Sequence, residues 1–378
     1  MVMKRWYYTI SILAVLPILL GAAGVGDRVR RPIAAGQYYP ANPAQLSAAV
    51  TQYISGVEPL KLPGPVIGCV VPHTTYRAGG AVMASAFKYF TPGQYDRVIV
   101  LSPALQAEFR GCSVPSAQYY RTPLGDVELD GKAIRRLTVN KLIDIRALIY
   151  RPEVYDSPYT ARHELHEKEP AVEVILPFLQ VQLGRFKLVP IVVGDLKKVT
   201  GEFDEPALDS IVNTLRAIID ERTLVVACSD FTRYGAIHNY TPFNTDIMQN
   251  ISRLDMAAIR LVEERRVRGF QAYLKDTKNT ITGPEAMCIL MRLMPPTSGG
   301  VMVGYDTTGR ITGNTRASVS SASIVFIDGV RERAARPAPI TITDKPRTEA
   351  AAPPVENIGP PAENVEVAPP DDAVHPTE

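Results

Sequence analysis

The sequence lacks several patterns that would assign it to a common functional class. No basic cluster is interleaved with aromatic residues and the net charge is only +2, so no nucleic acid is expected as a partner. The four cysteines include no CxxC pair, which excludes zinc-ribbon and thioredoxin-like sites. No internal repeat divides the 378 residues, of which 46% are hydrophobic. The composition therefore allows one large domain or two.

The longest apolar run, at residues 9–26, follows Lys4 and Arg5 and ends in small residues. This arrangement is typical of a secretory signal peptide, although a run of about 17–25 apolar residues can also span a bilayer. We therefore expect residues 1–26 to be a signal peptide or an N-terminal membrane anchor, with a buried helix as the alternative. We expect the body to be exported: periplasmic or extracellular, or anchored to the cytoplasmic membrane with the body outside.

Apolar strand-like runs alternate with helical patterns in the body, at residues 31–330. The expected strands are 66–73, 98–103, 186–195, 223–228, 301–306 and 321–328, and the expected helices are 42–54, 79–89, 130–139, 170–180, 206–220, 245–267 and 284–293. This alternation predicts an α/β fold, a three-layer α/β/α domain with a mostly parallel central sheet. Residues 150–168 are expected to form a loop. Residues 336–378, rich in Pro, Ala and acidic residues, are expected to form a disordered tail.

Polar side chains follow several of the expected strands. His73 ends the first, Ser102 the second, Asp195 the third, and Ser229 and Asp230 the fourth. Ligands of open α/β sheets bind in the crevice outside the carboxyl ends of the strands. We therefore expect a binding cleft at this edge.

Export would leave the pairing of the cysteines open. Cys69 and Cys228 lie in expected strands, Cys288 in an expected helix, and Cys112 in an expected loop. Four cysteines allow three pairings that sequence alone does not distinguish. Buried free thiols are the alternative, because cysteine is often a small core residue.

A series of short motifs, all in the same order, resembles those of one known family. They are GQYYP (36–40), PHTTYRAGG (72–80), SPALQ (102–106), TPLGD (122–126), EPAVEVILPFL (169–179), CSDFTRYG (228–235), LD (254–255), TITGPEA (280–286) and GYDTTG (304–309). Over residues 31–328 the chain resembles the Memo family, whose bacterial branch is called AmmeMemoRadiSam system protein B. The resemblance implies a fold similar to class III extradiol dioxygenases and, as in some members, a non-haem iron or copper ion in the cleft.

The resemblance also implies which residues would form the metal site, and most of them are substituted. One histidine and one aspartate are retained as His73 and Asp230. The other histidine and cysteine positions hold Leu105, Pro170, Arg233 and Thr282. None of these four is a useful ligand for a divalent metal, whereas about three protein ligands are needed to hold a catalytic one. The expected metal site is therefore largely lost, and no cofactor is expected.

The candidate cleft residues are His73, Asp230, Arg233, Ser229, Glu173 and Tyr76, and the catalytic residues, if any, are unknown. Three hypotheses follow. The first is a non-catalytic binding protein for a partner protein or an anionic small ligand, which Arg233 would hold unless it forms an ion pair with Asp230.

The second hypothesis is an iron- or copper-dependent redox enzyme with a site rebuilt around His73 and Asp230, using His163, His166 or His238 as a further ligand. The third is a hydrolase using Ser102 or Ser229, although neither serine lies in a G-x-S-x-G nucleophile elbow.

Overall fold

The structure is a computed structural model that describes residues 28–145, 147–148 and 163–329. The signal peptide or anchor expected at residues 1–26 and the tail expected at residues 336–378 lie outside these residues. Within the described part of the chain, no helix is both long enough and apolar enough to cross a membrane.

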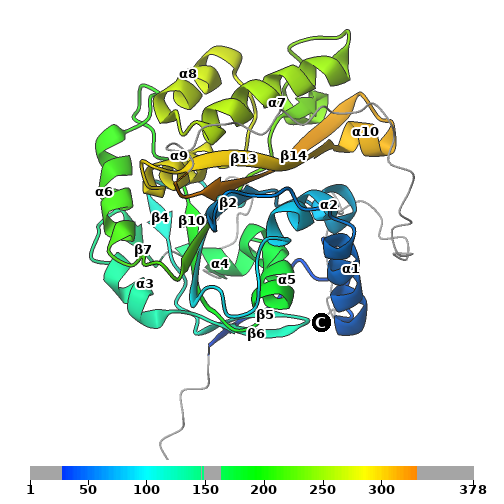
Figure 1. Cartoon of the computed structure of the whole chain (residues 1–378). Helices are drawn as coiled ribbons and strands as arrows, with labels where there is room; N and C mark the ends of the chain where they lie inside the picture. The colour runs from blue at the N-terminus through cyan, green and yellow to red at the C-terminus, as the bar shows by residue number, and fades with distance from the viewer. Residues whose placement is uncertain (1–27, 146, 149–162, 330–378) are drawn as a thin grey trace, which may run out of the picture.

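A nine-stranded sheet forms the centre of the domain (Figure 1). Its middle consists of four parallel strands, in the order β2 (Val66–Val71), β11 (Thr223–Cys228), β3 (Arg97–Pro103) and β10 (Lys187–Val193). The antiparallel flanks are β14 (Ala317–Ile327), which carries β12 (Arg233–Gly235) and β13 (Gly299–Thr307), and β4 (Cys112–Ser113), which carries β7 (Ile143–Asp144). The Val- and Ile-rich parallel strands are buried, as strands covered on both faces must be.

Helices cover both faces of this sheet (Figure 1). One layer contains α1 (Pro43–Ser55), α2 (Tyr76–Phe87) and α5 (Ala171–Leu183). The other contains α6 (Glu205–Arg216), α7 (Ile247–Glu263), α8 (Val267–Thr277) and α9 (Pro284–Leu293). The predicted α/β class is confirmed, and the parallel strands form its centre rather than the whole sheet.

Shorter elements complete the domain. β1 (Val29–Arg30), β5 (Tyr119–Thr122) and β6 (Gly125–Glu128) form a three-stranded sheet, and β8 (Ala147–Leu148) pairs with β9 (His163–Glu164). The short helices are α3 (Gly131–Leu137), α4 (Leu165–Lys168), α10 (Thr308–Thr312) and the 3₁₀ helix η1 (Ala236–His238).

The predicted helices are present, with ends shifted by a few residues. Two caps explain where helices begin: the side chain of Asn42 accepts the first N–H groups of α1, and that of Asp130 accepts the N–H of Ala133 in α3. The helix α8 and the strand β12 were not predicted. α8 does show helical periodicity, since Val267, Phe270 and Leu274 lie three and four residues apart, so the signal was present in the sequence although only Phe270 is buried.

Two expectations about loops were wrong. Cys112 lies buried in β4, a strand of two residues that is too short to show any alternation. Residues 163–168 form β9 and α4, while residues 149–162 of the expected loop lie outside the described part.

The parallel strands give the sheet two distinct edges. Their carboxyl ends define a C-terminal edge, which β2 and β11 reach just before His73 and Asp230. Their amino ends define an N-terminal edge, where β3 begins at Arg97 and β10 at Lys187.

Candidate functional site

The C-terminal edge brings His73 and Asp230 into direct contact. The backbone N–H of His73 donates to Oδ1 of Asp230 at 3.1 Å, and Nδ1 of the imidazole lies 3.5 Å from Oδ2. Both residues are buried. Their contact follows from the sheet, because β2 and β11 are adjacent and the N–H of Ser229 donates to the carbonyl of Val71 at 2.9 Å.

Thr282 completes this cluster from the turn before α9. Its Oγ1 lies 2.9 Å from Nε2 of His73 and accepts the N–H of Asp230, also at 2.9 Å. The backbone of Thr282 is held as well, because its N–H donates to the carbonyl of Asp230 at 3.0 Å and its carbonyl accepts the hydroxyl of Ser229 at 2.7 Å. The hydroxyl of Thr282 therefore occupies the ring nitrogen of His73 that faces away from Asp230.

The next residue explains how the chain turns into α9 at this point. Gly283 has φ +60°, a left-handed conformation that favours glycine. A Cβ there would lie 3.1 Å from Cβ of Pro103 and 3.3 Å from the carbonyl oxygen of Cys228. The start of α9 is thus packed tightly against the ends of β3 and β11.

Glu169 is a buried acid at this edge that the sequence analysis did not select. Its carboxylate accepts the backbone N–H of Leu105 at 2.7 Å, which fixes the loop after β3. Burial raises the pKa of Glu169 to about 7, although hydrogen bonds from backbone N–H groups and the charge of Arg30 oppose that rise. The signal that was available is its place at the head of the motif EPAVEVILPFL.

Arg233 lies in β12, beside the cleft. Its backbone N–H donates to Oγ1 of Thr280 at 3.0 Å, so the edge strand is tied to the segment that carries Thr282. Within the described residues, no ion pair joins its guanidinium to Asp230, and its buried Nε has no hydrogen-bond partner there. Arg233 is therefore a cation whose Nε can still donate a hydrogen bond.

Tyr38 is a second residue that was not selected. Burial raises the pKa of its phenol, and the charges of Glu169 and Asp230 raise it further, while that of Arg233 lowers it. Tyr38 is thus within electrostatic range of all three residues. Its only signal in the sequence is the motif GQYYP.

The structure places Glu173 and Tyr76 in the packing around α5. Glu173 is fully buried, pairs with Arg30, and accepts the N–H groups of Ile33 and Ala34 at 2.9 Å. The hydroxyl of Tyr76 donates to the carbonyl of Val174 at 2.9 Å. Both residues hold the N-terminal part of the body against α5.

Among the described side chains, neither His166 nor His238 forms a metal-binding group with His73 and Asp230. Both ring nitrogens of His166 are engaged, Nδ1 with the hydroxyl of Tyr120 at 2.6 Å and Nε2 with the carbonyl of Ser113 at 3.0 Å. Burial and the charge of Arg233 lower the pKa of His238. The side chain of His163 lies outside the described part.

The donor set does not fit a catalytic iron or copper ion. Among the described residues, no group of three His, Cys, Asp or Glu side chains is arranged to hold a metal. Leu105 and Pro170 contribute no donor side chain, and the hydroxyl of Thr282 is already bonded to His73. Cys228 is fully buried, which raises the pKa of its thiol and disfavours the thiolate that binds metals.

The serines show no nucleophile geometry either. Oγ of Ser102 is buried and has no hydrogen-bond partner among the described residues, and Oγ of Ser229 donates to the carbonyl of Thr282. The hydroxyl that contacts His73 belongs to Thr282.

The fold defines an α/β protein of the dioxygenase-like class, with His73 and Asp230 in contact at the carboxyl ends of parallel strands. A family model described as Memo-like protein matches residues 30–325, and the chain belongs to this family. The resemblance found in the motifs is thereby confirmed.

Three relatives show how distant the similarity is. The chain is 27% identical over 322 residues to the memo-1 homolog of Caenorhabditis elegans, covering 80% of this chain and 84% of that protein. It is 28% identical over 309 residues to a MEMO1 family protein of Methanopyrus kandleri, covering 79% and 99%. With human MEMO1 the identity is 26% over 264 residues, covering 68% and 81%.

Proposed function

We propose that this Memo-like domain is a non-catalytic binding protein that holds an anionic group of a small ligand or a partner protein in the cleft at the C-terminal edge. The main supporting observation is the contact between Oγ1 of Thr282 and Nε2 of His73 at 2.9 Å. That contact occupies the ring nitrogen that a metal would need. The family metal site is replaced in this proposal by a closed hydrogen-bonded cluster.

Arg233 is the group that would hold the ligand. A guanidinium forms two parallel hydrogen bonds with a carboxylate or a phosphate. The Nε atom of Arg233 is buried without a partner in the described part, and such an unpaired donor costs about 1–3 kcal/mol. An anionic ligand that accepts from this nitrogen would remove that cost, and the phenol of Tyr38 could donate to the same ligand.

Binding can be tested with phenyl phosphate and succinate as probes, using isothermal titration calorimetry on the full chain. Binding that is lost in Arg233→Gln and retained in the control Arg268→Gln would support the proposal. Arg268 suits as a control because it is an exposed arginine on α8. Equal binding by wild type and Arg233→Gln would refute the role of Arg233.

The alternative, an iron- or copper-dependent redox enzyme with a rebuilt site, makes the opposite prediction for the same purified protein. Metal analysis would then find stoichiometric iron or copper that is lost in His73→Ala. That result would overturn the binding proposal.

A hydrolase is a second candidate, because Thr282, His73 and Asp230 are in contact in the order hydroxyl, imidazole, carboxylate. Oγ1 of Thr282 would attack an ester carbonyl and pass its proton to Nε2 of His73, which would return it to the departing alcohol. Water would then hydrolyse the acyl-threonine. A fluorophosphonate probe should label Thr282 in the wild type and not in Thr282→Val, and an unlabelled wild type would end this candidate.

We also propose that the protein is exported, on the strength of the apolar run at residues 9–26. Cell fractionation and N-terminal sequencing of the mature protein would distinguish a cleaved signal peptide from a retained anchor. A protein found in the cytoplasm with residues 1–26 intact would contradict both.

A further inference from the structure

A groove of about 1020 Å³ opens at the N-terminal edge of the sheet, on the side opposite the cleft. The first turns of α3, the segment 115–119 before and at the start of β5, and residues 217–220 after α6 form its walls. Arg97 and Lys187, the first residues of β3 and β10, form its floor.

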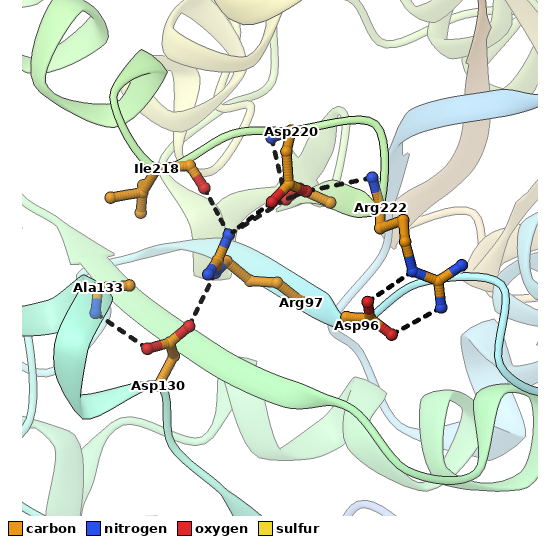
Figure 2. Close-up of polar contacts among 8 residues, drawn as sticks. Asp96, Arg97, Asp130, Ala133, Ile218, Asp220 and Arg222 are labelled. Atoms are coloured by element: carbon orange, nitrogen blue, oxygen red, sulfur yellow. Dashed lines mark hydrogen bonds and ion pairs between the residues drawn. The ribbon is translucent and has the colours of Figure 1, made fainter.

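Every acidic side chain of this groove is already paired. Figure 2 shows the guanidinium of Arg97 between two of them: its Nε donates to Asp130 at 2.9 Å, and its Nη1 reaches Asp220 at 3.4 Å and the carbonyl of Ile218 at 2.8 Å. The third, Glu128, pairs with Lys187 at 2.9 Å. These two cations and three carboxylates together leave a net charge of −1.

Three further cations in the groove have no such partner. Lys132, Arg135 and Arg136 lie at positions i, i+3 and i+4 of α3, so they share one face of the helix. All three are exposed, and none has an ion-pair partner among the described residues, while Ala133 and Leu137 on the other face are buried. We call this surface the basic groove, because its five cations and three carboxylates leave a net charge of +2.

The chain leaves the described domain at this same edge. β14 runs antiparallel to β2, and its last residue, Ile327, lies opposite Val66, the first residue of β2. The groove lies beside β3 and β10, which are three and four strands from β14 in the sheet order. At about 4.8 Å per strand, the lateral distance is roughly 15–20 Å.

The sequence that follows Arg347 carries the complementary charge, whereas residues 330–347 hold five Lys or Arg and two acidic residues. After Arg347 it contains no lysine or arginine, and its acidic residues are Glu349, Glu356, Glu363, Glu366, Asp371, Asp372 and Glu378. At the roughly 3.1 Å per residue of an extended proline-rich chain, the 19 residues between Gly329 and Glu349 are long enough to span about 60 Å. The tether is thus several times longer than the distance to the groove.

We propose that residues 349–378, the acidic segment, bind the basic groove of the same molecule through Lys132, Arg135 and Arg136. Because the acidic segment is tethered near the groove, its effective concentration there is high, and modest electrostatic attraction suffices. The contact is charge-driven and should weaken with salt.

Zero-length carbodiimide cross-linking of the full chain, read by mass spectrometry, tests this contact, because it joins a lysine to a carboxylate only where they touch. Lys132 should form links to the acidic segment about tenfold more often than Lys278, an exposed lysine at the end of α8, on account of the local concentration. In Arg135→Glu/Arg136→Glu, the links to Lys132 should fall several-fold. Unchanged thermal unfolding of this exposed-site variant would confirm that it is folded.

Two outcomes would overturn the proposal. Equal linking of Lys132 and Lys278 to the acidic segment would show that the segment has no preferred site. The second outcome combines two results: Lys132 forms no links to the acidic segment, and the wild type binds vesicles of anionic lipid whereas the Arg135→Glu/Arg136→Glu variant does not. The groove would then bind a membrane surface instead.

Discussion

The two edges of the central sheet supply different partners to their acidic side chains. At the C-terminal edge, backbone N–H groups supply the partners of the acidic residues: Leu105 donates to Glu169, and His73 donates to Asp230. At the N-terminal edge, guanidinium groups supply them, as Arg97 does for Asp130 and Arg222 does for Asp96 (Figure 2). Neutral donors compensate a buried carboxylate less than a cation does.

The pKa values of one acid at each edge reflect this difference. Burial raises the pKa of Glu169 to about 7, because the donors around it do not offset the desolvation. Burial also acts to raise the pKa of Asp130, but the N–H of Ala133 and the guanidinium of Arg97 together lower it below its ordinary value. The C-terminal edge therefore contains a group that titrates near neutral pH, whereas the acid at the N-terminal edge is held ionised.

The largest expected effect comes from Glu169→Gln, which replaces the titrating carboxyl of Glu169 with a neutral amide. A carboxyl whose pKa rises from 4.5 to about 7 on folding binds its proton more tightly in the folded state, so stability falls as pH rises through this window. At 1.36 kcal/mol per unit, wild type should lose about 3 kcal/mol between pH 4.5 and 7.5 relative to Glu169→Gln. Denaturant unfolding across this range measures the difference, and parallel curves for the two proteins would contradict it.

Arg97→Met should cost about 2 kcal/mol, because it leaves the carboxylate of Asp130 and the carbonyl of Ile218 without their donor. The part of stability due to the lowered pKa of Asp130 is present above pH 3.8 and is lost as pH falls below it, so this acid sensitivity should also shrink. Urea unfolding of Arg97→Met, Asp130→Asn and the double variant gives the coupling. Additive effects would mean that the two residues do not act as a pair.

Thr282→Val should cost about 1 kcal/mol, since it removes the partner of Nε2 of His73 and of the N–H of Asp230 at nearly constant volume. Thr312→Val is the matched control: its exposed hydroxyl donates to the carbonyl of Thr308 in its own helix and accepts the N–H of Asn314 at 3.3 Å. A cost in the control as large as in Thr282→Val would show that the cluster contributes nothing specific.

The smallest effect is expected for Arg222→Gln at the N-terminal edge. The Arg222–Asp96 contacts, at 2.5 and 2.6 Å, are exposed, and pairs of this kind are weakened by solvent and by salt. The melting temperature should not change measurably at about 0.15 M salt. A clear drop there would mean that this pair acts as part of the Arg97 network.

The strands were predictable because they are long apolar runs that end in polar residues at one edge. His73 and Asp230 followed from that pattern, and their contact follows from the adjacency of β2 and β11. The role of Thr282 was not predictable, since it depends on the turn at Gly283 that places its hydroxyl on His73. From the sequence, Thr282 was known only as a substituted ligand position.

Other parts of the site depend on contacts between distant segments, which no local pattern reports. Glu169 reaches the loop after β3 through the N–H of Leu105, 64 positions earlier in the chain. Arg233 lies in β12, a three-residue strand that forms only because β14 lies beside it. The basic groove was not predicted for the same reason, because α3 contributes its cations and two other segments, 115–119 and 217–220, contribute walls.

The reactivity of the buried cysteines would report how the sheet of this protein opens. A thiol reacts as the thiolate, and burial raises the pKa of the Cys69 and Cys228 thiols. An alkylating reagent can therefore modify these thiols only after a local opening of their strands exposes them. Cys69 and Cys228 lie in the central strands β2 and β11, whereas Cys112 lies in the short flanking strand β4. The order in which these positions are alkylated would report which strands separate first. A ligand in the cleft should delay Cys228 more than Cys112.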